Sequence, residues 1–249
     1  AIIARYQAAA QVADDWRPLW QECYAYALPE QARQFGMGGS LRRARDTLYD
    51  GTAADAAEQL AASLLGYLTP PWVNWFAFGA GPMVTDDDMR TRLTPVLAHA
   101  AATLQGQIDQ SHLTTELHQS LLDLVVGGTG CLYIAENPPG AFVPFTVRSV
   151  PLHELTLAED EDGRLSCLYR ARRLTRTAAL TLCDPESTAY QQILDLSDNE
   201  LDILEFCEPD RDGYSLGVLA LMGSGDPLCL RMMRRDTSPF ILFRWLKTP

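Results

Sequence analysis

Residues 121–137 read LLDLVVGGTGCLYIAEN, and this stretch divides the chain into two parts of different character. Up to Val126 the apolar residues recur at helical spacing, and the glycines that follow are typical of a helix end. The CLYIAEN segment after them is a short apolar run typical of a strand. GGTG at 127–130 lacks the lysine and hydroxyl residue of a phosphate-binding loop, so a helix end followed by a strand is the preferred interpretation.

The chain upstream of residue 130 is predicted to be mainly helical. Residues 3–28 are alanine-rich and carry larger apolar side chains at helical spacing, with a break expected at Pro18 and a stop at Pro29. RQFGMGGS at 33–40 is expected to be a loop. The DTLYDGTAADAAEQLAASLLGYL segment then presents an apolar stripe, which predicts a second helix.

Two short patterns predict where helices begin. Thr52 and Asp55, three residues apart, match a capping box, and Thr85 and Asp88 repeat the same pattern. The DDD run that includes Asp88 is interpreted as the acidic first turn of a helix. Pro95 is expected to kink or restart that helix.

The chain from 131 to 249 is predicted to be β-rich, because short strand-like pieces alternate with Gly, Pro, Asp and Asn. Asp162-Gly163 and GSGDP at 223–227 are hairpin signals between such pieces. One short helix is expected near residues 175–183. The predicted fold class is therefore α+β, an N-terminal helical region followed by a β-rich region of short strands and hairpins.

The aromatic stretch GYLTPPWVNWF at 66–76 raises a separate question. The two prolines end the preceding helix, and WVNWFAF at 72–78 is predicted to be a strand. Both faces of such a strand would be largely apolar, so two coverings are expected: the protein's own helices on one face, and the β-rich half or a neighbouring subunit on the other. Trp72, Trp75 and Phe76 are the candidate packing or subunit-interface residues. No polar groups converge beside them, which disfavours a ligand platform.

Charge limits the classes of partner. The formal net charge is −12, and Lys247 is the only lysine. This balance argues against a protein that grips nucleic acid along its whole surface, because neutralising phosphates needs clustered cations. No stretch approaches the roughly 20 apolar residues of a membrane helix, so no membrane contact is predicted.

Two basic clusters stand out, LRRAR at 41–45 and YRARRLTR further along. In a strand Arg170 and Arg172 share a face, so these residues and Arg173 are candidates for polar contacts with an acidic partner or a phosphate. A solvated strand edge is the alternative interpretation, and the preferred one.

No catalytic, cofactor or metal site is predicted. The six cysteines have no C-x-x-C pair, which indicates reduced thiols rather than a disulfide framework or a zinc site. HLTTELH at 112–118 is not the H-E-x-x-H zinc motif. Cys131 lies in an apolar strand-like run, where an inert buried thiol is expected. The consecutive carboxylates at 86–88 point in different directions along a helix. An enzyme is therefore disfavoured.

Five segments of the chain carry a resemblance through their order and spacing. They are YAYALPE at 24–30, LYDGTAADAAEQLAASL at 48–64, LTPPWVNWF at 68–76, DLVVGGTGCLYI at 123–134 and SPFILFRW at 238–245. Together they resemble the head-to-tail connector, or portal, proteins of short-tailed bacteriophages over nearly the whole chain, which corresponds to the N-terminal half of such a protein. Gly51 stands where members often have serine, and the chain stops at Pro249 without the Tyr-Gly segment that usually follows the RW pair.

The resemblance implies a structural role. Residues 1–130 would be a mainly helical wing region containing the aromatic strand, and residues 131–249 a β-rich wing region. The stem, clip and crown would lie beyond residue 249. The protein would form a ring, usually of twelve copies, at one capsid vertex of the virion after assembly in the host cytoplasm.

The same resemblance implies partners. These are other copies of the chain, the terminase large subunit, the major capsid or scaffolding protein, a tail adaptor protein, and double-stranded DNA that passes without sequence specificity during packaging and ejection. The acidic composition fits a channel that binds phosphates weakly. The alternative is the non-catalytic half of a nucleic-acid-processing enzyme whose active site lies beyond residue 249.

Overall fold

Gly128 marks the point where the helical part of the chain passes into the β-rich part. Helix α5 (Leu113–Gly127) ends there because Gly128 has a φ of 80°, in the left-handed region that favours glycine. Strand β1 (Thr129–Glu136) begins at the next residue. The predicted helix end followed by a strand is therefore confirmed.

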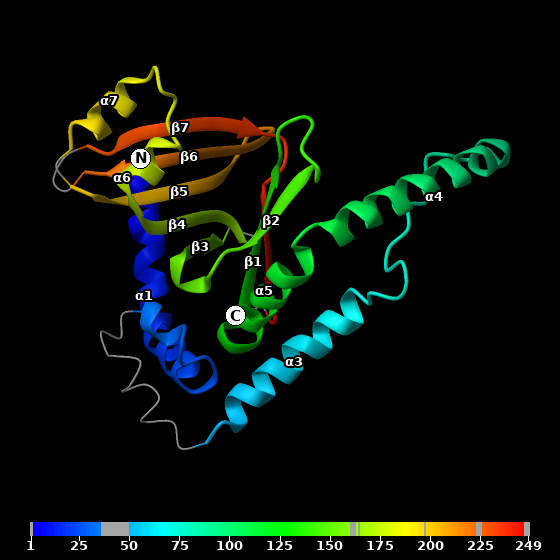
Figure 1. Cartoon of the computed structure of the whole chain (residues 1–249), viewed down its shortest axis with the longest axis horizontal. Helices are drawn as coiled ribbons and strands as arrows, with labels where there is room; N and C mark the ends of the chain where they lie inside the picture. Colours follow the sequence, from blue (N-terminus) through cyan, green and yellow to red (C-terminus); the bar gives the residue numbers. More distant parts are fainter. Residues whose placement is uncertain are drawn as a thin grey trace.

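The computed structural model describes residues 2–35, 50–159, 163, 165–196, 198–222 and 226–246. Within these residues the fold is α+β, with N-terminal helices followed by antiparallel sheets, as predicted (Figure 1). Most of the loop expected at 33–40, and all of the basic cluster at 41–45, lie outside the described residues.

Two helices of the N-terminal part contain an internal proline. The first, α1, is unbroken at Pro18, so the predicted break is wrong, and α4 runs through Pro95 as one helix. A proline inside a helix removes one hydrogen bond, and the turns on both sides hold the remainder of a long helix together. Besides α5, the helical elements here are α1 (Ile2–Ala27), the 3-10 helix η1 (Ala32–Phe35), α3 (Thr52–Leu68) and α4 (Asp87–Gln110).

At the start of α3 and α4, aspartates rather than the predicted threonines accept backbone hydrogen bonds, although the N-cap residue of α3 itself is Gly51. The carboxylate of Asp50 accepts hydrogen bonds of 2.9 and 2.7 Å from the backbone N and the Oγ1 of Thr52, the first residue of α3. Asp86 is the N-cap of α4 and accepts from the backbone N of Asp88 at 3.1 Å. The helices begin close to where the sequence predicted, but a carboxylate one or two residues upstream satisfies the free N–H groups.

The β-rich part forms two antiparallel sheets (Figure 1). In the smaller sheet the order is β2-β1-β8, so the last strand of the chain pairs with the first. In the larger sheet neighbouring strands follow in chain order, β3-β4-β5-β6-β7. The remaining strands are β2 (Phe145–Ser149), β3 (Leu155–Glu159), β4 (Leu165–Thr175), β5 (Glu200–Asp210), β6 (Gly213–Leu221), β7 (Leu228–Arg235) and β8 (Phe240–Arg244).

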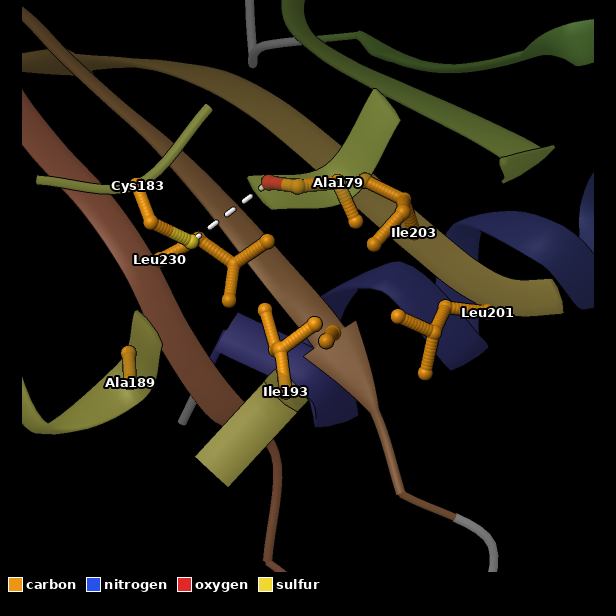
Figure 2. Packing of buried hydrophobic residues seen from close by; sticks show 8 residues of the cluster. Ala179, Cys183, Ala189, Ile193, Leu201, Ile203 and Leu230 are labelled. Atoms are coloured by element: carbon orange, nitrogen blue, oxygen red, sulfur yellow. Dashed lines mark hydrogen bonds between the residues drawn. The ribbon is translucent and has the colours of Figure 1, made fainter. Parts of the chain in front are cut away.

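Two short helices cover one end of one face of the larger sheet. Helix α6 (Arg176–Leu180) is the short helix predicted near 175–183, whereas α7 (Thr188–Leu194) was not predicted. Figure 2 shows Ile193 of α7 close to Leu201 and Ile203 of β5 in a fully apolar cluster. This layer seals the sheet at the end away from the smaller sheet.

The same face of the larger sheet packs against the smaller sheet further along. Cys207, four residues after Ile203 and therefore on the same side of β5, clusters with Cys131 of β1 and Phe240 of β8. The opposite face lies under α1, where Ala9 packs with Phe206 and its neighbours. Helix α1 thus closes the side of the sheet that the smaller sheet leaves open.

Both predicted hairpins join antiparallel strands. β3 pairs with β4 around Gly163, which has a φ of 67°, and β6 pairs with β7. Asp162 and the Gly-Ser-Gly residues at 223–225 lie outside the described residues. The pairing of the flanking strands is therefore confirmed at both places.

The strand predicted over 72–78 is not formed, so this prediction is wrong. These residues connect α3 to α4 and pair with no strand of the described chain. Helix α3 carries the segment away from both sheets (Figure 1), so no sheet edge reaches it to exchange hydrogen bonds. Alternating aromatic residues favour a strand only where such an edge is available.

Candidate functional site

The most exposed apolar part of the molecule is a projection that we call the arm, residues 66–100. It comprises the end of α3, the connection to α4 and the first turns of α4, and none of its residues is buried. In Figure 1 it extends away from the sheets to one end of the long axis. Its exposed large apolar side chains are Tyr67, Leu68, Trp72, Val73, Phe78, Met83, Met89 and Val96.

The three aromatic residues singled out from the sequence lie in this arm in two different situations. The rings of Trp75 and Phe76 pack edge to face with centroids 4.9 Å apart, and Phe76 also contacts Phe78 at 5.7 Å. Trp72 is 77% exposed. The arm therefore has a small aromatic cluster that supports its own shape and a tryptophan that remains available for contact.

A second apolar surface is a groove of about 1060 Å³ beside α1. Its walls come from α1, the C-terminal end of α5, the edge strand β3 and the residues at the end of β8. Six large apolar side chains that line it are exposed rather than buried: Val12, Trp16, Leu19, Leu60, Trp245 and Leu246. The groove is thus a concave apolar surface open to solvent.

The charged groups of the groove are satisfied within the chain. Arg5 donates its guanidinium hydrogens to both carboxylate oxygens of Glu208, which also accepts from the Tyr169 hydroxyl. Burial opposes ionisation of Glu208, but these hydrogen bonds together hold its pKa below the usual range. On the other side, Arg244 pairs with Glu159. A molecule entering the groove therefore meets paired ions.

The basic residues predicted on β4 are paired with the chain's own carboxylates. Arg170 contacts Glu154 at 2.6 Å and Glu205 at 3.5 Å, and Arg172 also pairs with Glu205. The two arginines share a face, as predicted. Strand β3 pairs with β4 only as far as Arg170, so at Arg172 and Arg173 the paired neighbour of β4 is β5. Contact of these arginines with a partner, a phosphate or solvent stays a prediction.

Arg173 lies on the other face of β4. It forms an exposed ion pair of 2.8 Å with Asp202, its direct neighbour on β5. Such an exposed pair contributes little to stability because water screens both charges. The structure thus brings Arg170 and Arg172 together and separates Arg173 from them.

The residues weighed as chemical groups occupy structural positions. Burial raises the pKa of the Cys131 thiol to about 12, which keeps it protonated and unreactive at neutral pH. His118 lies 3.3 Å from Glu58 on the neighbouring helix. Within the described part of the chain no three His, Cys, Asp or Glu side chains are grouped so as to hold a metal ion. No disulfide joins the six cysteines, all of which are described.

Sequence reasoning missed the groove and the polar groups buried behind it. The walls of the groove come from segments far apart in the sequence, so no local pattern reports them. Asp123 and Glu208 were detectable in principle, because each carboxylate interrupts an apolar run, LLDLVV and LEFCEP. A charged residue in such a run indicates a buried partner.

An α+β fold with an exposed apolar arm, in which the β4 arginines are engaged in ion pairs, is more typical of a structural or assembly protein than of an enzyme. Comparison with known families agrees. The sequence profile described as "Bacteriophage head to tail connecting protein" matches residues 1–249. The chain therefore belongs to the bacteriophage head-to-tail connecting protein family. A search of curated protein sequences finds no match.

Family membership establishes the general role of the protein. Proteins of this family are structural components of the phage virion at the junction of head and tail, which implies contacts with capsid and tail components. Among the described residues no helix has the length and apolar character required to span a bilayer.

Proposed function

We propose that the chain is a portal subunit of a short-tailed phage, which assembles with other copies into a ring at one capsid vertex. The observation that carries the proposal is the family match over residues 1–249, together with the five ordered segments that resemble portal proteins. The described helices and sheets correspond in this proposal to the wing region. The ring would contact the capsid or scaffolding protein, the terminase large subunit and the tail adaptor.

The distribution of charge supports a conduit for double-stranded DNA. The net charge is −12, and Arg170, Arg172 and Arg173 all face carboxylates of the same chain. DNA binding strengthens with each phosphate that a free cation neutralises, so a surface with paired arginines would let DNA pass in both directions without sequence specificity.

Native mass spectrometry of the full-length protein tests the proposal. We expect one closed ring of about a dozen copies, because head-to-tail contacts close when the rotation between copies divides a full turn. A protein that stays a monomer or dimer under all assembly conditions would contradict the proposal. That result would instead favour the non-catalytic half of a nucleic-acid-processing enzyme.

A further inference from the structure

Most of the exposed apolar side chains belong to two surfaces on different sides of the molecule. Of nineteen large apolar side chains exposed in the described part of the chain, eight lie on the arm and six line the groove beside α1. Monomeric proteins rarely expose contiguous apolar patches of more than a few hundred Å². Each surface therefore requires a partner.

The arm of one copy cannot fill the groove of the same copy. Leu60 at the root of the arm lines the groove, but from there α3 leads away, and the arm projects on the side opposite α1 (Figure 1). Helix α4 has 24 residues and is therefore about 36 Å long, which keeps the far end of the arm well away from α1. The arm of the same copy is therefore not the occupant of the groove.

Charge favours a second copy of this chain as the occupant of the groove. Residues 59–85, which include the aromatic part of the arm, contain no Asp, Glu, Lys, Arg or His. The charged residues that line the groove, Arg5, Glu159 and Arg244, are already paired. Two copies with a net charge of −12 repel in most orientations, whereas the uncharged segment enters the groove without burying an unpaired ion.

The apolar area exposed on the arm is also large enough for a protein interface. A buried aromatic side chain contributes about 150–250 Å², and Tyr67 and Trp72 are 87% and 77% exposed. Together with the other exposed side chains of the arm, they approach the roughly 800 Å² per partner of a standard protein interface.

We propose that the arm of one subunit inserts its uncharged aromatic segment into the groove beside α1 of the next subunit. The two surfaces differ, so the contact is head to tail, and repetition generates a ring rather than a symmetric dimer. This inference rests on the proposed portal function and specifies which surfaces join neighbouring subunits.

Photo-crosslinking of the full-length protein tests the contact. A benzophenone amino acid replaces Trp72, and an equal mixture of isotopically heavy and light protein distinguishes crosslinks between copies from those within one copy. We expect heavy–light crosslinks from position 72 to the 12–20 segment of α1 or to Trp245 and Leu246. The matched control places the same amino acid at Phe142, which is exposed but belongs to neither surface.

The outcomes separate the inference from the proposed function. A ring whose position-72 crosslinks lie within one copy, reach another surface or are absent would overturn the inference and leave the portal function standing. Crosslinks in virions to a capsid or tail protein in place of α1 would also overturn it. A full-length protein that forms no ring would overturn both.

Paired variants give a second readout. Val73→Asp places a charge on the arm, and Val12→Asp places one in the groove. In a head-to-tail contact each variant retains one intact surface, so we expect a mixture of the two to form one-to-one pairs that neither variant forms alone. Failure to pair, with both variants folded, would contradict the contact.

Discussion

Tyr24 on α1 donates a hydrogen bond of 2.6 Å to Oδ1 of Asp123 on α5, and both side chains are buried. Burial raises the pKa of Asp123 to about 6, although the hydrogen bonds from Tyr24 and from the backbone of Leu152 act in the opposite direction. This contact ties the helix that covers the larger sheet to the helix that supports the arm.

The Asp123 carboxyl should make stability depend on pH. Its ordinary pKa is 3.8, so between about pH 4 and 6 the folded chain retains a proton there that the unfolded chain has released. The Asp123 contribution to stability therefore falls as the pH rises through that window and is constant above it. Relative to Asp123→Asn, we expect the free energy of unfolding of the wild type to fall by about 2 kcal/mol from pH 4 to pH 7. Parallel urea-unfolding profiles for the two proteins would refute the assignment.

Glu208 should show the opposite dependence. Its pKa is lowered, so its contribution is present at neutral pH and is lost as the pH falls through the folded-state value. Glu208→Gln removes the charge that Arg5 and Tyr169 face, and we expect a loss of about 1–3 kcal/mol at pH 7 that shrinks at low pH. Glu22→Gln, at an exposed position of α1, is the control.

Substitutions at two neighbouring residues of α7 should differ sharply in their effect on the free energy of unfolding. Ile193 is fully buried against β5, whereas Leu194 is 43% exposed. Ile193→Ala leaves a cavity and should cost about 2–5 kcal/mol, while Leu194→Ala should change the unfolding free energy little. Equal effects of the two substitutions in chemical denaturation would mean that α7 does not pack as described.

The tryptophans of the arm should contribute little to the stability of the single chain. Trp72→Ala should leave the melting temperature unchanged, because most of the side chain is exposed and makes few contacts within the chain. Trp75→Ala should cost about 1 kcal/mol, the worth of its contact with Phe76 rather than of a core indole. Thermal unfolding of a preparation that contains only single chains is the measurement. A loss of 3 kcal/mol or more would place Trp75 in a core.

Cysteine reactivity should follow burial. Cys229 is exposed on β7, and Cys131 is fully buried with a raised pKa. Iodoacetamide at pH 8 should therefore alkylate Cys229 in the native protein and leave Cys131 unmodified until denaturant is added. Mass spectrometry of the digested protein reads both sites, and rapid native labelling of Cys131 would contradict its position.

Local signals in the sequence predicted the boundary between the two parts. The glycines at 127–128 were sufficient there, because a left-handed backbone at a helix end is a property of a single residue. The short helix α6 and the hairpin strands were predicted for similar reasons. The resemblance to the connector family likewise rested on short segments of the sequence. The family match supports that resemblance for a head-to-tail connector.

Features that depend on distant segments were not predictable. The 72–78 segment has the composition of a strand, but its conformation depended on whether a sheet edge lay nearby, and none does. The sequence around the β4 arginines did not indicate that Glu205, on another strand, forms ion pairs with both Arg170 and Arg172. The groove likewise exists only once α1 and the end of β8 lie beside the same sheet edge.

The pairing of β1 with β8 also sets the order in which the chain can fold. Thr129 pairs with Arg244, so β1 gains its second neighbour only after the ribosome has synthesised nearly all of the described residues. Until then one edge of β1 is open, and contacts of such long sequence separation form slowly. A chain truncated before Phe240 would lack β8 and leave this edge of β1 open for pairing with other chains.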